Sequence, residues 1–98
     1  MNLNNKNDQV EILNQYLDSL AKIKNYSPNT VKSYKNDILQ YLKEEIVLGE
    51  FAKFLKICSK KEYSKSTINR KITSIKTFLN WCIEKNYLNT SALKSVKN

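Results

Sequence analysis

The sequence predicts an all-α domain of four helices followed by a short fifth helix. Its 98 residues include only one glycine and one proline, too few for the frequent turns of an all-β domain. Apolar residues recur at intervals of three and four in four separate stretches, which is the spacing that lines one face of an α-helix. A chain of this length forms one domain around one core.

The first helix is predicted over residues 9–23. Asp8 is placed to cap its N-terminus, with Glu11 three residues later as in a capping box. The expected buried stripe and the apolar residues beside it are Val10, Leu13, Leu17 and Leu20, flanked by Ile12, Tyr16 and Ile23. Residues 1–8 are polar and rich in asparagine, so we expect a disordered tail there and a folded domain over residues 9–96.

The second helix is predicted over residues 28–45. Ser27 is a favoured N-cap residue, and Pro28 fits the first helical position because its missing N–H would have no helical partner there. The expected core residues are Val31, Tyr34, Ile38, Tyr41 and Leu42, and Gly49 is expected in the turn that follows.

The third helix is predicted over residues 50–60, and the fourth over residues 65–85 with Ser64 as its N-cap. The third is expected to bury Phe51, Phe54, Leu55 and Cys58. The fourth is expected to bury Ile68, Ile72, Ile75, Phe78, Leu79, Cys82 and Ile83. Asn86 suits a C-terminal cap. Residues 91–96, together with Leu88, are expected to form the short closing helix. Trp81 is expected to pack under this helix, and the alternative is that it covers a partner surface.

The residues that are missing exclude several classes of function. The chain has no histidine, the commonest general base and zinc ligand. Neither paired carboxylates nor a glycine-rich phosphate loop replaces it, so we expect no catalytic residue, no metal site and no cofactor. Cys58 and Cys82 are interpreted as reduced core thiols of a cytoplasmic protein. No apolar run approaches the ~18 residues of a membrane span, and no membrane partner is expected.

The positive charge is concentrated in the second half of the chain. Residues 1–50 hold six lysines and seven acidic residues, a net charge of −1. Residues 51–98 hold ten lysines, Arg70 and two acidic residues, a net charge of +9, so the whole chain carries +8. This asymmetry favours a polyanionic partner, with nucleic acid as the first candidate and an anionic membrane surface as the second. A lysine-rich composition by itself would spread lysine evenly and would not deplete acidic residues from one half.

Two of the predicted helices carry a polar strip without acidic residues on the side opposite the core, at ~100° of rotation per residue. The first strip, on the second helix, comprises Asn29, Lys32, Ser33, Asn36, Gln40 and Lys43. The second strip, on the fourth helix, comprises Ser66, Asn69, Arg70, Thr73, Lys76, Thr77 and Asn80, with Lys65 and Lys71 flanking it. Asp37 and Glu44 are placed toward the other flank of the second helix.

These residue types suit contact with double-stranded DNA. Lysine and arginine neutralise phosphates, asparagine and arginine make paired hydrogen bonds to base edges, and serine and threonine reach phosphate oxygens. Both strips start at a helix N-terminus, whose free N–H groups also bind phosphate. The alternative is that the strips are ordinary solvated faces, although such faces usually carry Glu–Lys pairs. For Arg70 the alternative is a salt bridge at the helix surface.

Two segments also match a known pattern. Residues 26–34 read S-P-x-T-apolar-x-x-Y from the serine onward, and residues 35–42 continue as K-x-D-apolar-x-x-Y-L. Residues 64–78 read SKSTINRKITSIKTF, followed by Trp81 and by Asn86-Tyr87-Leu88. In this order and helical setting they resemble the N-terminal core-binding domain of tyrosine recombinases, the phage-integrase family. The resemblance covers nearly the whole chain and implies a SAM-like orthogonal bundle.

The resemblance implies a role in DNA integration or DNA recombination by a mobile element. The domain would form one half of a clamp around the recombination site, and a separate C-terminal catalytic domain the other half. The implied partners are double-stranded DNA, that catalytic domain and further recombinase protomers in a synaptic assembly. The candidate DNA-binding residues are Asn29, Lys32, Ser33 and Asn36, and also Lys65, Ser66, Asn69, Arg70, Thr73, Lys76 and Thr77.

The family's chemistry needs a tyrosine nucleophile together with arginines, a lysine and histidines. A chain with one arginine and no histidine cannot assemble that set, so we expect a binding domain that is not itself an enzyme. The alternative is a helical protein-interaction module that binds an acidic partner. A small helix-turn-helix repressor is a third interpretation, disfavoured because the polar segment between the third and fourth helices lacks a glycine.

Overall fold

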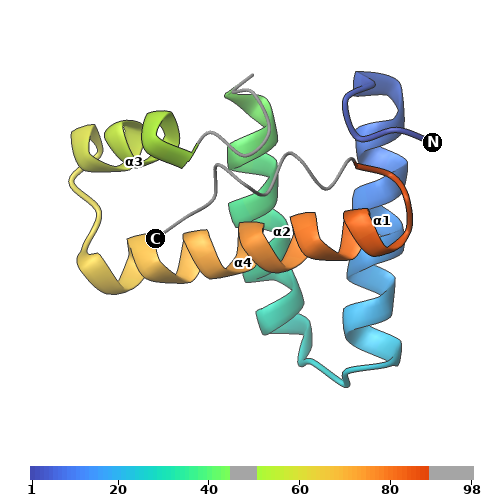
Figure 1. Cartoon of the computed structure of the whole chain (residues 1–98). Helices are drawn as coiled ribbons and strands as arrows, with labels where there is room; N and C mark the ends of the chain where they lie inside the picture. Colours follow the sequence, from blue (N-terminus) through green and yellow to red (C-terminus); the bar gives the residue numbers. More distant parts are fainter. Residues whose placement is uncertain (45–50, 89–98) are drawn as a thin grey trace.

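Two antiparallel helices, α1 (Lys6–Lys22) and α2 (Pro28–Lys43), are crossed by a long helix, α4 (Lys65–Glu84), in the computed structural model of the chain (Figure 1). A shorter helix, α3 (Phe51–Lys60), precedes α4. The structure describes residues 1–44 and 51–88. All regular elements within these residues are helices, so the predicted all-α class is confirmed. The turn expected at Gly49 and the fifth helix expected over residues 91–96 lie outside the described residues.

The N-terminal segment is more ordered than the sequence suggested. Helix α1 begins at Lys6, and Asn5 caps it by accepting a hydrogen bond from the N–H of Asn7 at 3.0 Å. Leu3 is fully buried, and its N–H donates to the carbonyl of Tyr87 at 2.8 Å. The expected cap at Asp8 is therefore wrong, and the disordered tail expected for residues 1–8 is not what the structure shows. Burial of Leu3 offsets the entropy lost when this polar segment is ordered.

The buried face of α1 is displaced from the predicted stripe. Its buried residues are Ile12, Leu13, Tyr16, Leu17 and Leu20. Val10, expected in the buried stripe, is 63 % exposed, and Ile23, expected beside it, is 79 % exposed. Val10 lies at the edge of the buried arc, and Ile23 is the C-cap residue, at which the helix ends.

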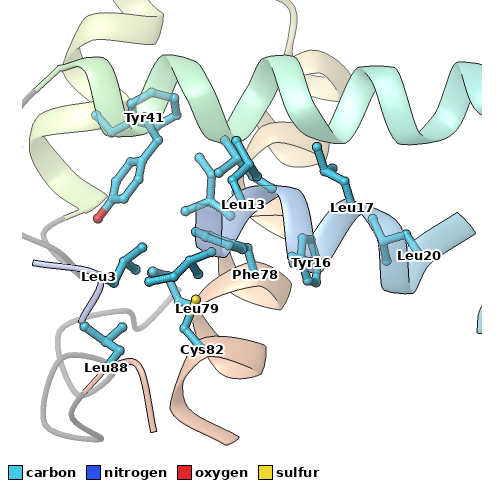
Figure 2. Close-up of a cluster of buried hydrophobic side chains, with 14 of the residues drawn as sticks. Leu3, Leu13, Tyr16, Leu17, Leu20, Tyr41, Phe78, Leu79, Cys82 and Leu88 are labelled. Carbon is cyan, nitrogen blue, oxygen red and sulfur yellow. The ribbon is translucent and has the colours of Figure 1, made fainter. Parts of the chain in front are cut away.

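The core lies where α1, α2 and α4 meet, and α3 adds to it (Figure 2). The rings of Tyr16 and Phe78 contact edge to face at 5.2 Å between centroids, and those of Tyr41 and Phe54 at 5.5 Å. The buried residues are Leu3, Ile12, Leu13, Tyr16, Leu17, Leu20, Ile38, Tyr41, Phe54, Cys58, Ile75, Phe78, Leu79, Cys82 and Leu88. The expected core positions Val31, Tyr34, Leu42, Ile68, Ile72 and Ile83 are half-buried against this set.

Helix α3 buries Phe54 and Cys58 as predicted, but Leu55 is 36 % exposed. Leu55 follows Phe54 directly, so it is turned about 100° away from the buried side of this short helix. The side chain of Phe51 lies outside the described residues. Both cysteines are free and buried, as the sequence indicated. Trp81 is half-buried and packs against Tyr16 and Tyr87 at 5.3 and 5.9 Å between ring centroids.

A non-glycine residue with positive φ follows three of the helices: Asn25 after α1, Glu62 after α3 and Asn86 after α4. Asn86 after α4, with φ of 63°, confirms the predicted C-terminal cap. Its N–H donates to the carbonyl of Ile83 at 3.0 Å, and the N–H of Tyr87 donates to Cys82 at 2.8 Å, the two bonds of a Schellman motif. Glu62 after α3 adopts the same conformation, with φ of 58°. Within residues 1–44 and 51–88, no helix has the length and apolarity to span a bilayer.

Candidate nucleic-acid interface

The two strip-bearing helices, α2 and α4, begin in the same way. Ser27 is the N-cap of α2, and its Oγ accepts a hydrogen bond from the N–H of Thr30 at 3.3 Å. Ser64 caps α4 by accepting a bond from the N–H of Thr67 at 3.2 Å. Both predicted caps are confirmed. Neither first turn contains an acidic residue, so no side chain there compensates the positive end of either helix dipole.

The first strip lies on the solvent side of α2. Four of its residues are exposed and two are half-buried: exposed are Asn29, Lys32, Asn36 and Lys43, and half-buried are Ser33 and Gln40. The strip therefore forms a polar surface that a partner can contact along the helix.

The second strip lies on α4 and has the same character. Five of its members are exposed, namely Ser66, Asn69, Arg70, Thr73 and Asn80, as is the flanking Lys65. Half-buried are Lys76 and Thr77. The hydroxyl of Thr77 donates to the carbonyl of Thr73 at 2.8 Å. This bond occupies the one proton of that hydroxyl, so Thr77 retains only acceptor capacity toward a partner.

A buried carboxylate joins the two helices. Asp37 of α2 is fully buried, and its two oxygens accept hydrogen bonds from Nε and Nη2 of Arg70 on α4, at 3.2 and 3.1 Å. Nζ of Lys71 donates to the same carboxylate at 3.0 Å. Oγ of Ser74 lies 3.1 Å from the carboxylate and 2.9 Å from the carbonyl of Arg70, and its one proton is shared between these two acceptors. Together these contacts offset the cost of taking the carboxylate out of water.

Lys71 extends these contacts to the turn that precedes α4. Its Nζ donates to Oε1 of Gln40 at 2.8 Å and lies 5.1 Å from the ring centroid of Tyr63. Nε2 of Gln40 donates to the Tyr63 hydroxyl at 3.2 Å. We call the connected residues the Asp37 cluster: Asp37, Gln40, Tyr63, Arg70, Lys71 and Ser74. The cluster ties α2 both to α4 and to the turn that leads into it.

Two sequence-based placements are wrong at this cluster. Asp37, expected on the other flank of α2, faces α4, and Lys71, expected beside the second strip, is buried at 7 % exposure. Asp37 lies three residues after Tyr34 and four before Tyr41, so it shares the side of α2 that faces the core. Lys71 likewise precedes Ile75 by four residues. A charged residue within an apolar row is the signal that predicts such a buried pair.

The Asp37 cluster carries one negative and two positive side chains, a net charge of +1. The side chain of Lys71 is 9 % exposed, whereas that of Arg70 is 50 % exposed. The excess positive charge therefore reaches solvent at Arg70, within the second strip. The salt-bridge interpretation of Arg70 is confirmed in part, because its partner is a buried carboxylate rather than a surface one.

The described residues offer no activated nucleophile and no metal centre. Burial raises the pKa of Cys82 to about 12 and also raises the pKa of Cys58, so both thiols are protonated at neutral pH. Burial likewise raises the pKa of the hydroxyls of Tyr16 and Tyr34. Within residues 1–44 and 51–88, no group of three or more Cys, Asp or Glu side chains is arranged to hold a metal ion.

Known proteins resemble this chain over most of its length. The family model described as phage integrase, N-terminal SAM-like domain, matches residues 13–86. A tyrosine recombinase XerC of Listeria monocytogenes serotype 4b (strain F2365) is 26 % identical over 94 residues, which cover 86 % of this chain and 31 % of the relative. The XerC of Listeria welshimeri is 28 % identical with the same coverage. The XerC of Treponema denticola is 25 % identical over 97 residues, 90 % of this chain and 32 % of the relative.

The chain spans about a third of the length of these curated relatives. No solved structure is significantly similar to it. The segment that matches the family model contains all of α2, α3 and α4, and hence both strips and the Asp37 cluster. The family match, together with the all-α arrangement of the helices, shows that the chain belongs to the phage integrase N-terminal, SAM-like domain family.

Proposed function

We propose that this chain is the DNA-binding arm of a site-specific tyrosine recombinase that acts in DNA integration or recombination. Its family and the names of its relatives support this assignment. Because the chain spans about a third of those relatives, we assign strand cleavage to a separate catalytic domain. The proposed partners are double-stranded DNA, that catalytic domain and further recombinase protomers, and the proposed compartment is the cytoplasm.

The observation that carries the proposal is the position of both strips beside the Asp37 cluster. On α2, Ser33 and Gln40 lie four and three residues from Asp37, so they adjoin it on the helix surface. On α4, Ser66 lies four residues before Arg70. On each helix the buried members of the cluster, Asp37 on α2 and Lys71 and Ser74 on α4, lie between the strip and the core residues, whereas Gln40 and Arg70 belong both to the cluster and to a strip. Both strips therefore extend outward from one contact between α2 and α4, which supports a continuous surface for a duplex.

The charge and residue types of this surface suit a nucleic-acid duplex. Lys32 on the first strip and Arg70 on the second carry positive charge at exposed positions. Asn36 and Asn69 are exposed amides, which pair with the donor and acceptor of adenine in the major groove. Charged contacts to phosphates supply affinity without sequence preference, whereas amide contacts to base edges supply specificity.

Fluorescence anisotropy of a labelled duplex tests the proposal directly. With about four phosphate contacts, raising the salt from about 50 to about 200 mM is expected to lower the affinity about a hundredfold. Lys32→Ala and Arg70→Ala should each weaken binding about three- to tenfold. Lys56→Ala, which removes the same charge from an exposed position on α3 outside both strips, is the matched control and should change little. Absence of binding at the lower salt concentration would contradict the proposal.

One groove favours the alternative function, a module that binds an acidic partner. It has a volume of about 790 Å³, and its lining combines apolar residues such as Val10 and Leu39, the lysines Lys6, Lys43 and Lys61, neutral polar side chains and the acidic Glu44. Val10 and Leu39 are 63 % and 39 % exposed, and exposed apolar residues with a charged rim are typical of protein contacts. Under this alternative, Val10→Ser weakens capture of an acidic amphipathic peptide, and the duplex titration shows no binding.

A further inference from the structure

Arg70 has donors left over after its contact with Asp37. A guanidinium has five N–H donors in a rigid plane. The structure pairs Nε and one Nη2 hydrogen with the carboxylate, at 3.2 and 3.1 Å. The Nη1 pair and the second Nη2 hydrogen lie on the other edges of the guanidinium plane. Because the side chain is 50 % exposed, that side of the fork is open to an external anion.

Attraction of an anion to Arg70 depends on the net charge around Asp37, to which Lys71 contributes. If Arg70 were the single cation at Asp37, the pair would be neutral and the guanidinium would present little net charge. Lys71, whose side chain is 9 % exposed, bonds the same oxygen of Asp37 that Nη2 of Arg70 bonds. The buried ammonium therefore compensates the buried carboxylate, and the charge of Arg70 remains available at the surface.

We infer that Asp37 is a positioning residue for DNA binding, which holds Arg70 so that its free N–H edge faces a backbone phosphate. This inference rests on the proposed function. The carboxylate fixes a flexible arginine through two parallel bonds, so less rotamer entropy is lost when the phosphate binds. Lys71 and Ser74 hold the carboxylate in turn.

For the DNA affinity of an Asp37→Asn variant, the inference predicts a change in the opposite direction to the one expected from net charge alone. Asp37→Asn removes a negative charge from a DNA-binding protein, and charge alone predicts tighter binding with a steeper salt dependence. Loss of positioning predicts weaker binding, about three- to tenfold, and a salt slope that is shallower by about one phosphate contact. Asp18→Asn is the matched control, since it removes the same charge from an exposed carboxylate on α1 that pairs with Lys22. That variant should bind as tightly as the parent chain, or more tightly.

A second variant, which leaves the net charge unchanged, separates the loss of Arg70 positioning from a loss of stability. Asp37→Asn leaves Lys71 buried without its carboxylate, which destabilises a small domain. Asp37→Asn combined with Lys71→Met removes one charge of each sign and leaves no buried ammonium. It retains Arg70 and the net charge of +8, yet it should bind DNA about as weakly as Arg70→Ala does. Circular dichroism confirms that each variant is folded at the temperature of the titration.

A double-mutant cycle separates positioning from a general structural role. If Asp37 acts through Arg70, Asp37→Asn should cause no further loss of affinity in the Arg70→Ala background. A purely structural role would lower the affinity of both backgrounds by the same factor and would overturn the inference. So would an Asp37→Asn variant that binds like Asp18→Asn. If the parent chain itself does not bind the duplex, the proposed function fails first.

Discussion

The guanidinium of Arg70 holds the carboxylate of Asp37 through two bonds of 3.2 and 3.1 Å, across 33 residues of sequence. The pair lies where α2 contacts α4, and the carboxylate is fully buried. The pair therefore stabilises the contact between α2 and α4 and also positions Arg70 at the surface. Its effect on the stability of the domain can be measured without DNA.

Asp37→Asn is expected to lower the free energy of unfolding by about 3 kcal/mol or more, because the ammonium of Lys71 stays buried without a carboxylate. Adding Lys71→Met should recover much of this loss, since the buried charge is then absent. Urea denaturation of both variants measures the difference. Asp18→Asn breaks an exposed pair with Lys22 and should cost less than about 1 kcal/mol. Equal losses for Asp37→Asn and Asp18→Asn would contradict the assigned role of the buried pair.

Glu62→Gly is expected to stabilise the domain by about 0.5–1 kcal/mol. Glu62 lies two residues beyond the end of α3 and has φ of 58°. This conformation is unfavourable for a residue with a Cβ and free of that penalty for glycine. Thermal unfolding measures the gain. Asn86→Gly, at φ of 63°, is the comparison and should gain less, because asparagine tolerates this region. A loss of stability in Glu62→Gly would show that the glutamate side chain contributes more than its backbone conformation costs.

Tyr16→Phe is expected to leave the stability unchanged or to raise it by about 1 kcal/mol. Among the described residues, the Tyr16 hydroxyl is buried without a hydrogen-bond partner, and such a group keeps its full desolvation cost. Phenylalanine preserves the ring contact with Phe78. Tyr87→Phe, which removes a hydroxyl that donates to Gln15 at 3.0 Å, is the control and should be slightly destabilising. A large loss in Tyr16→Phe would indicate that the hydroxyl is bonded in solution.

The stability of the domain is expected to decline above about pH 9. Burial raises the pKa of Cys82 from 9.0 to about 12, so between these values the unfolded chain has released a proton that the folded chain retains. The unfolded state then binds fewer protons, and the free energy of unfolding falls by up to about 1.4 kcal/mol per pH unit. Below about pH 9 the thiol is protonated in both the folded and the unfolded chain, so it adds no pH dependence to the free energy of unfolding. Urea denaturation at about pH 7.5 and about pH 10.5 measures the decline, and Cys82→Ala should make it smaller.

The sequence by itself determined the features that depend on neighbours along the chain. Ser27 and Ser64 could be recognised as caps because the hydrogen bond that each makes reaches only three residues ahead. Asn86 could be recognised as a helix terminator for the same reason. The periodic apolar residues likewise indicated the class, and the order of the motifs indicated the family. The location of both strips away from the core also followed from this periodicity, although Ser33, Gln40, Lys76 and Thr77 are half-buried.

The tertiary structure alone decided which distant residues meet. Leu3 lies in a polar segment and yet is fully buried, and its N–H donates to the carbonyl of Tyr87 at the other end of the described chain. The place of Asp37 within an apolar row of α2 signals burial, but only the crossing of α4 shows that Arg70 and Lys71 are its partners. The physical reason is that helical periodicity gives the direction of a side chain around its own axis, whereas the partner of a buried charge depends on how the helices cross.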